Sequence, residues 1–364
     1  MIKPPLYGLH EALGARFGDY SGWSMPESYG SPEDECRAAR EAAVVADLTH
    51  RGKLRMSGRD RVKFLQGMIT NDVEKLKPGE GLYAAMLTVK GKMITDMTIY
   101  CERESFLIDL EPGMNGAIRD ALLKFRLSYK AEIEDATEGL ALLSVNGPGA
   151  ASVVRGALGG GGEEAASVDR YRFVEVDVGE SGAGKGARAI VAGVNRTGGR
   201  GYDIYVPKGS AGEVWDRLIK SGARPIGLRA METLRIEAGI PRYGVDMNEE
   251  TIPLEAGLDH AVNYDKGCYV GQEVVARIHW RGHVNWVLSG FFLAGREPPS
   301  PGSELRDRNK KAGYITSSAY SPSLDRVIAL GYVRRELAEP GSEAVLKTED
   351  GGIAELAKTP FVQP

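Results

Sequence analysis

The chain has 364 residues, too many for one ordinary hydrophobic core, so its length predicts two or three domains. A composition of 42% hydrophobic and 26% charged residues is typical of soluble globular proteins, and a net charge of −4 gives no electrostatic reason to expect nucleic acid or an acidic membrane as a partner. The three cysteines are too few and too widely spaced for a disulfide framework or a zinc site. Because no signal peptide or apolar run of membrane length is found, we expect a cytoplasmic protein.

The first 140 residues predict helices combined with an antiparallel sheet. Pro32 followed by acidic residues suits the first turn of a helix, and alternating apolar residues mark strands. Residues 89–92 join two of these strands as a hairpin connection. The expected helices are 32–44, 60–69 and 113–126, and the expected strands are 53–58, 81–87, 93–100 and 106–110. This order of elements predicts an α+β unit.

A second unit begins near residue 140. Four consecutive glycines at 159–162 predict a flexible surface loop. The expected strands are 140–145, 171–178, 187–194 and 202–206, and the expected helices are 148–157, 210–221 and 227–239. From residue 286 onward, short strands alternate with turns rich in proline and glycine, which predicts a small all-β terminal domain.

Residues 179–186 come close to the phosphate-loop pattern GxxxxGK[ST], but glycine stands where the pattern needs a hydroxyl residue for magnesium. The segment that follows predicts a strand, whereas a phosphate loop opens a helix whose N-terminus meets the anion. We therefore interpret 179–186 as a hairpin loop and exclude nucleotide hydrolysis.

Asp96 is the first candidate catalytic residue. It lies in the middle of the expected strand 93–100, where alternation places it on one face with Ile94, Thr98 and Tyr100. A carboxylate among apolar neighbours is costly unless it is paired, exposed or used. Asp96 is therefore either an exposed strand residue or, in a pocket, an acceptor or base for a bound N–H group, flanked by Thr98 and Tyr100.

The second candidate is the octapeptide KGCYVGQE at 266–273, which surrounds one thiol with opposite charges and two glycines. Cys268 is either a small buried hydrophobic residue or a thiol whose pKa is lowered by Lys266. No histidine close in sequence supports a Cys–His pair, and one cysteine alone holds no metal. The residues of the motif are Lys266, Gly267, Cys268, Tyr269, Gly271, Gln272 and Glu273.

A third segment, 243–250, contains Asp246, Glu249 and Glu250 within five residues. It lacks the ligand spacing and the later bidentate glutamate of a calcium loop. We expect a solvated loop, with a functional loop as the alternative.

Short segments in a fixed order along the whole chain carry a family resemblance. They are GWSMP at 22–26, TNDV at 70–73, RIEAG at 235–239, YGVDM at 243–247, GYITS at 313–317 and YSPSL at 320–324. Together they resemble the aminomethyltransferase (T-protein) of the glycine cleavage system and its YgfZ-like relatives. The resemblance implies an α+β protein built as a three-domain cloverleaf that binds tetrahydrofolate, with a C-terminal β-barrel.

The resemblance also implies domain bounds and site residues. The first α+β domain would comprise 1–50 and 140–240, the second 51–139 and 241–283 with the folate site at their junction, and the barrel 284–364. Asp96 matches the T-protein acid beside the reactive nitrogens of the folate. The other expected folate-binding residues are Tyr83, Thr98, Tyr100, Asp203 and Tyr243.

Four features favour the YgfZ-like branch, whose members act in maturing or repairing iron–sulfur enzymes. The octapeptide resembles that branch's signature, which glycine-cleavage enzymes lack. Met231 replaces an arginine, Arg51 replaces a methionine, and the strand 107–110 lacks an asparagine that T-proteins use on the pterin.

We therefore expect a tetrahydrofolate-binding YgfZ-like protein that supports iron–sulfur enzymes, with Asp96 and Cys268 as catalytic residues and iron–sulfur assembly proteins as partners. One alternative is an aminomethyltransferase that forms methylene-tetrahydrofolate and ammonia from an aminomethylated lipoyl H-protein. The other is a folate-binding regulator without turnover. Whether the chain is an enzyme depends on the branch, and each reading uses tetrahydrofolate or another folate without metal, nucleic acid or membrane.

Overall fold

The computed structural model describes residues 1–178, 187–308, 310–339, 346–349 and 351–363, so the segment 179–186 with its phosphate-loop-like pattern lies outside the described residues. The chain forms two compact units. The first comprises Met1–Gln66, Asp72–Tyr83 and Met97–Met231, and the second comprises Gly67–Asn71, Ala84–Asp96 and Glu232–Pro364. None of the helices in the described ranges is long and apolar enough to cross a membrane.

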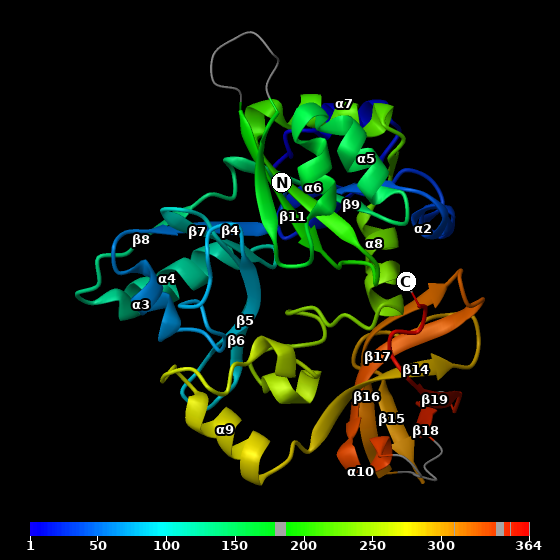
Figure 1. The fold of residues 1–364 in the computed structure, drawn as a ribbon. Coiled ribbons are helices and arrows are strands. Elements are labelled where there is room, and N and C mark those ends of the chain that lie inside the picture. The colour runs from blue at the N-terminus through cyan, green and yellow to red at the C-terminus, as the bar shows by residue number, and fades with distance from the viewer. Residues whose placement is uncertain (179–186, 309, 340–345, 350, 364) are drawn as a thin grey trace. The chain divides into compact units, whose positions relative to one another are not determined.

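The first unit contains a six-stranded sheet covered by helices on one face (Figure 1). Its strand order is β10 (Phe173–Asp177), β11 (Arg188–Val194), β12 (Gly201–Pro207), β9 (Leu140–Asn146), β3 (Val44–Asp47) and β13 (Arg224–Pro225). The covering helices are α5 (Ala150–Ala157), α6 (Gly162–Ser167) and α7 (Ala211–Lys220). Tyr202, Ile204 and Val206 point from β12 into the core with these helices. By strand alternation, Asp203 and Tyr205 point to the opposite face.

The glycine run 159–162 is helical, so the predicted flexible loop is wrong. Gly159–Gly161 forms a 3-10 turn, and Gly162 is the first residue of α6. A Cβ on Gly161 would lie 2.8 Å from the Val176 side chain, and one on Gly162 would lie 2.1 Å from the carbonyl oxygen of Arg155. Glycine is therefore required by close packing of α6 against α5 and β10, which composition alone does not reveal.

A five-stranded sheet has the order β5 (Gly81–Leu87), β6 (Met93–Cys101), β7 (Ser105–Leu110), β4 (Gly52–Ser57) and β8 (Glu132–Asp135). Helices α3 (Arg61–Gln66) and α4 (Asn115–Arg126) follow β4 and β7 in the chain. Thr98 pairs with Asp109, and Asp109 pairs with Lys53 in the next strand. These three side chains therefore form a row on one face of the sheet.

Lys53 is fully buried within this sheet. Its Nζ donates to the carbonyl oxygens of Thr49 at 2.9 Å and Arg51 at 2.7 Å. Burial lowers the pKa of Lys53 from 10.5 to about 8, although Asp109 opposes this shift. The ammonium group thus braces the loop that follows β3.

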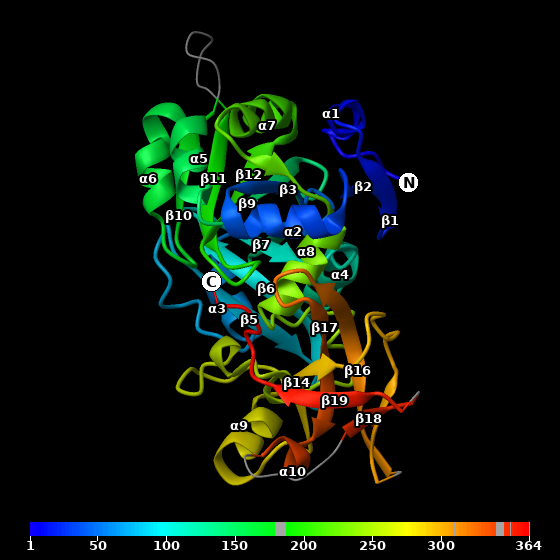
Figure 2. The same cartoon turned by 90° about the vertical axis from the view of Figure 1, so that its right-hand side faces the viewer.

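The second unit contains a closed β-barrel (Figure 2), which confirms the all-β terminal domain predicted from residue 286 onward. Its strands are, in order around the barrel, β14 (Trp286–Leu293), β17 (Arg326–Arg334), β16 (Lys310–Ser321), β15 (Glu304–Asp307), β18 (Leu346–Thr348) and β19 (Ile353–Ala357). Phe291, Ile315, Val327 and Val333 are fully buried in its hydrophobic core. The alternation of apolar residues along these strands is what fills the interior.

Asp246 connects the segment after helix α8 (Leu228–Glu237) to the barrel strand β16. One of its oxygens, Oδ1, accepts from the hydroxyls of Thr316 at 2.5 Å and Ser317 at 2.7 Å. The other, Oδ2, accepts from the backbone N–H of Arg242 at 3.0 Å and from the Arg235 guanidinium. The solvated loop predicted for 243–250 is therefore wrong at Asp246, which is buried. Its burial is tolerated because both carboxylate oxygens accept hydrogen bonds.

We predict that Asp246→Ala lowers the free energy of unfolding by about 3–5 kcal/mol, because it leaves Arg235 buried without its main counter-charge. Chemical denaturation followed by circular dichroism measures the change. Glu249→Ala removes an exposed acid of the same segment and should stay within about 0.5 kcal/mol of the parent. Equal losses in the two variants would contradict a structural role specific to Asp246.

We further predict a pH-dependent contribution from Lys53. Between about pH 8 and pH 10.5 this amine is protonated in the unfolded chain but largely neutral in the folded one, so the unfolded state binds more protons. The free energy of unfolding should therefore gain up to about 3 kcal/mol from this group as pH rises through that window. The measurement is the difference between parent and Lys53→Met in denaturant unfolding at pH 8 and pH 10. If this difference does not change with pH, the pKa of Lys53 is not lowered.

Candidate functional site

Several polar side chains of the first unit meet between the six-stranded and the five-stranded sheet. The five-stranded sheet contributes Tyr100 and Asp109, and the six-stranded sheet contributes Asp203 and Tyr205. The rings of Tyr100 and Tyr205 meet edge to face with their centroids 5.9 Å apart. Arg196, in the loop between β11 and β12, reaches Asp109 at 3.2 Å and so joins the two sheets. The face that the helices leave uncovered is therefore lined by aromatic and charged groups.

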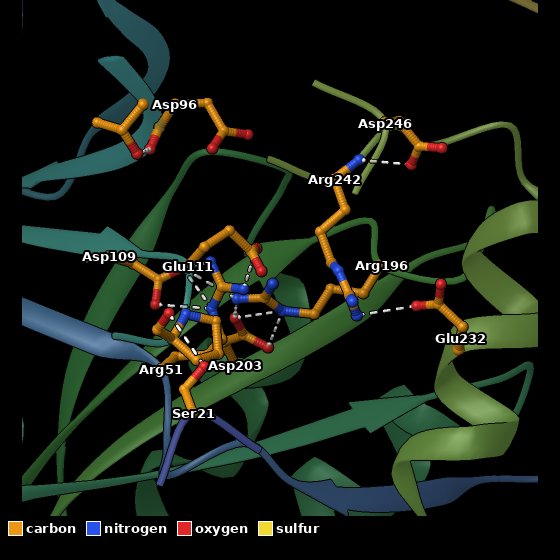
Figure 3. Close-up of polar contacts among 12 residues, drawn as sticks. Ser21, Arg51, Asp96, Asp109, Glu111, Arg196, Asp203, Glu232, Arg242 and Asp246 are labelled. Atoms are coloured by element: carbon orange, nitrogen blue, oxygen red, sulfur yellow. Dashed lines mark hydrogen bonds and ion pairs between the residues drawn. The ribbon is translucent and has the colours of Figure 1, made fainter. Parts of the chain in front are cut away.

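Two arginines and three acids form one ion-pair cluster in this region (Figure 3). Arg51 donates from Nε and Nη2 to Asp109 at 3.0 and 2.8 Å, and from Nη1 to Glu111. Arg196 donates from Nε to both oxygens of Asp203, at 3.1 and 2.9 Å. The Arg196–Asp109 contact links the two halves, so the five side chains act as a single unit.

Asp109 and Arg51 stay ionised although they are buried. Burial alone would raise the pKa of Asp109, but Arg51 and Arg196 hold it below its usual range. Burial alone would lower the pKa of Arg51, but Asp109 and Glu111 raise it well above its usual value. Burial raises the pKa values of Tyr100 and Tyr205, which are therefore neutral phenols. The region offers fixed charges and neutral hydroxyls side by side.

The loop after β3 holds Arg51 in place. His10 and Asp47 are buried, and His10 Nε2 lies 2.9 Å from Asp47 Oδ2. Asp47 Oδ1 accepts from the backbone N–H of Thr49 at 2.8 Å. Lys53 Nζ donates hydrogen bonds to the carbonyl oxygens of Thr49 and Arg51. These contacts fix the backbone at Arg51 independently of its side-chain contacts, so the guanidinium is preorganised.

The structure brings together some of the residues expected to bind the folate. Tyr100 and Asp203 are buried and belong to the region between the sheets, and Thr98 is half-buried in the row with Asp109. Tyr83 is half-buried on β5. The sequence analysis missed Lys53 and Arg196 as part of this region. Lys53 carried no signal in the sequence, because it stands at the first position of the expected strand 53–58, which contains a second cation, Arg55.

Asp96 and Tyr243 are two buried residues of the second unit with polar groups. Each is only 8% exposed, so the reading of Asp96 as an exposed strand residue is wrong. Its neighbours on the other strand face, Met93 and Thr95, are fully buried, which is why the strand stays in place around a carboxylate. Burial, Glu249 and Asp96 raise the pKa of Tyr243 to about 12. Tyr243 is therefore a neutral hydrogen-bond donor in the field of the Asp96 carboxylate.

Much of the octapeptide 266–273 has a packing role in the second unit. Lys266 is buried, and its Nζ donates to the carbonyl oxygens of Ile69 at 2.8 Å and Asn71 at 2.7 Å. Its Nζ also lies 5.2 Å from the centre of the Tyr269 ring. Gly271 has φ +87° and begins helix α9 (Gln272–Arg281), and a Cβ there would lie 2.6 Å from the carbonyl oxygen of Thr88. The lysine and this glycine are therefore required to hold the segment against its neighbours.

The remaining residues of the octapeptide lie nearer the surface. Cys268 is exposed, so its interpretation as a buried hydrophobic residue is wrong. Gly267 and Glu273 are also exposed, and Gln272 is half-buried. Within the ranges described above, no group of three or more histidine, cysteine, aspartate or glutamate side chains is arranged to hold a metal ion.

Comparison with known proteins connects this architecture to one family. The model of the GCVT N-terminal domain matches residues 6–266, and the model of the glycine cleavage T-protein C-terminal barrel domain matches residues 287–363. An aminomethyltransferase from Rubrobacter xylanophilus is 37% identical over 99% of this chain and 94% of its own. An aminomethyltransferase from Halothermothrix orenii is 33% identical over the full length of both chains.

A solved structure agrees with the sequence comparisons. The crystal structure of the glycine cleavage system aminomethyltransferase T from Bartonella henselae superposes with a TM-score of 0.89. It is 26% identical in sequence, and the match covers 100% of this chain and 98% of that one. The α+β architecture with a C-terminal barrel, inferred from the resemblance, is thereby confirmed.

The expected YgfZ-like function in iron–sulfur enzyme maturation is wrong. Full-length relatives at 33% and 37% identity are named aminomethyltransferase, which favours the first alternative. Lys266 and Gly271 of the octapeptide are explained by packing contacts within the second unit. Their presence beside Cys268 is therefore not evidence of thiol chemistry. By the match of both domain models and of full-length relatives, the chain belongs to the glycine cleavage T-protein family.

Proposed function

We propose that the chain is an aminomethyltransferase. It would take an aminomethyl group from the lipoyl arm of a partner protein, pass the one-carbon unit to tetrahydrofolate and release ammonia. The observation that carries this proposal is Asp96, a mid-strand carboxylate that is 8% exposed and whose charge helps to raise the pKa of Tyr243. Such a carboxylate is costly to bury and suited to charge that develops on a bound amine. The relatives named aminomethyltransferase support the same reaction class.

The residues of the first unit fit tetrahydrofolate. A pterin is a flat ring system with hydrogen-bond donors and acceptors on its edges, and the region between the sheets combines buried aromatic rings, guanidinium groups and a hydroxyl. Tyr100, Thr98, Arg51 and Arg196 are the groups we assign to its binding. Direct contact of Asp203 with the carrier stays a prediction, since both of its oxygens already accept from Arg196. When bound, tetrahydrofolate would supply the nitrogen nucleophile.

Asp96 performs the electrostatic and proton-transfer work in this proposal. Its carboxylate accepts hydrogen bonds from bound N–H groups, takes up a proton as the nitrogen loses it, and stabilises positive charge while ammonia departs. Low exposure strengthens each of these interactions, because little water competes. Tyr243 remains protonated across the physiological range, so its hydroxyl can donate a hydrogen bond.

We predict that Asp96→Asn lowers kcat about 10²–10⁴-fold, because the amide neither accepts a proton nor carries charge. Ammonia release and methylene-tetrahydrofolate formation with an aminomethylated lipoyl carrier protein measure turnover. Calorimetric titration with 5-formyltetrahydrofolate should give a Kd within about 3-fold of the parent, since the isosteric change leaves the fold and the other contacts in place. Glu249→Gln, an exposed acid whose charge also acts on Tyr243, serves as control and should keep its turnover.

Loss of binding in parallel with turnover in Asp96→Asn would reassign the residue to carrier binding. Absence of turnover in the parent protein, with carrier bound, would reject the aminomethyltransferase proposal itself.

We also predict that Cys268→Ala leaves aminomethyl transfer within about 2-fold of the parent. The thiol is exposed, and the reaction as proposed needs no second nucleophile. The same assay of ammonia release measures the effect, and Lys266→Met is a useful contrast because it removes a buried ammonium that holds two carbonyl groups. That variant should lose thermal stability, whereas Cys268→Ala should not. A turnover defect in Cys268→Ala would show that the thiol takes part after all.

A further inference from the structure

Asp109 is a buried acid whose hydrogen bonds are made to arginines within the protein. It is 1% exposed and lies between Thr98 and Lys53 in the row across the five-stranded sheet. Arg51 Nε lies 3.0 Å from each of its oxygens, and Arg51 Nη2 lies 2.8 Å from Oδ2. Arg196 Nη2 adds a fourth contact to Oδ2 at 3.2 Å. Three of these contacts are to Oδ2 and one is to Oδ1. Because the residue is only 1% exposed, Asp109 is closed to a ligand.

The accessible part of this cluster consists of donors. The side chains of Arg51 and Arg196 are 12% and 20% exposed, whereas that of Asp109 is 1% exposed. Each guanidinium carries five N–H groups. The contacts of Arg51 occupy Nε and one hydrogen on each terminal nitrogen, and Arg196 Nη1 contacts no acid within the described part of the chain. N–H groups thus remain available on a wall whose carboxylates are already paired.

Arg51 is also the best fixed of these donors. Its backbone N–H donates to the carbonyl oxygen of Leu48 at 3.0 Å, and its own carbonyl oxygen accepts from Lys53 at 2.7 Å. Glu111 holds one end of the guanidinium and Asp109 the other. A donor held in this way loses little conformational entropy when a ligand binds.

We propose that Arg51 determines the specificity of the carrier site: it neutralises Asp109 and presents guanidinium N–H donors, so this wall takes a heterocycle edge that bears acceptors, such as an oxo group or an unprotonated ring nitrogen. The proposal rests on the proposed function, since it names the residue that selects the carrier. It separates two roles that are usually confounded. Charge balance at Asp109 depends on Arg51 and Asp109 together, whereas the N–H donors that Arg51 offers a ligand do not depend on the charge of Asp109.

A double-mutant cycle distinguishes the two roles. Arg51→Met, Asp109→Asn and the double variant are compared by thermal unfolding and by calorimetric titration with 5-formyltetrahydrofolate. Each single variant should have a lower Tm, because one member of a buried pair is left behind. The double variant should regain at least half of the Tm lost in Arg51→Met, since removing both partners is less costly than removing one.

Binding should follow a different order. Asp109→Asn keeps the donors and should bind within about 3-fold of the parent, whereas the double variant should bind at least about 10-fold more weakly, as the loss of a charged hydrogen bond predicts. If Arg51 contacts the carrier, the double variant should therefore recover Tm without recovering affinity. Affinity that recovers together with Tm in the double variant would overturn the proposal and leave Arg51 a role in charge balance only.

A matched pair in the same unit provides the control. Arg55 and Glu102 form a two-contact ion pair, with Nε–Oε2 and Nη2–Oε1 both at 3.1 Å, and neither residue is among those assigned to carrier binding. The variant Arg55→Met/Glu102→Gln should keep the parent affinity. If the parent protein binds no reduced folate, the proposed function fails and this proposal with it. If the parent binds and the Arg51→Met/Asp109→Asn variant binds equally well, only the present proposal fails.

Discussion

The first unit depends on burying charge between two sheets. Arg51 and Arg196 bridge three acids, and Arg196 connects Asp203 on β12 with Asp109 on β7. A buried ion pair is often worth less than a well-packed apolar contact, because desolvation offsets the Coulomb attraction. Such a cluster therefore makes a poor general-purpose core. Its value is a fixed arrangement of donors and charges in a region that the helices α5, α6 and α7 leave uncovered (Figure 1).

The second unit uses the same device for a different purpose. Asp246 accepts from an arginine, a backbone N–H and two hydroxyls of the barrel strand β16, so each of its two oxygens accepts two hydrogen bonds. Glu237, at the end of α8, accepts from Ser321 farther along the same strand. These contacts fasten the chain entering the second unit to its barrel. Asp96 and Tyr243 lie in this unit too, each 8% exposed.

The octapeptide 266–273 shows how a dense motif can mislead. From its letters alone, the lysine beside the cysteine suggested a tuned thiol. In the folded chain the ammonium of Lys266 is directed at the carbonyl oxygens of Ile69 and Asn71, which are nearly two hundred residues away in sequence. Gly271 is required by a positive φ and by the close approach of Thr88. Residues that resemble a reactive site can thus be selected by packing.

The sequence by itself determined most element types and the all-β terminal domain, because hydrophobic periodicity and glycine–proline turns are local properties. The short segments that resemble the T-protein family indicated the family and the barrel. It also singled out Asp96, since a carboxylate amid apolar alternation is anomalous wherever the strand lies. Only the tertiary structure decided that 159–162 is helical, that Asp246 is buried and that Arg196 meets Asp109. Each of these depends on a partner distant in the chain, and neither composition nor spacing encodes which side chains a fold brings within hydrogen-bonding distance.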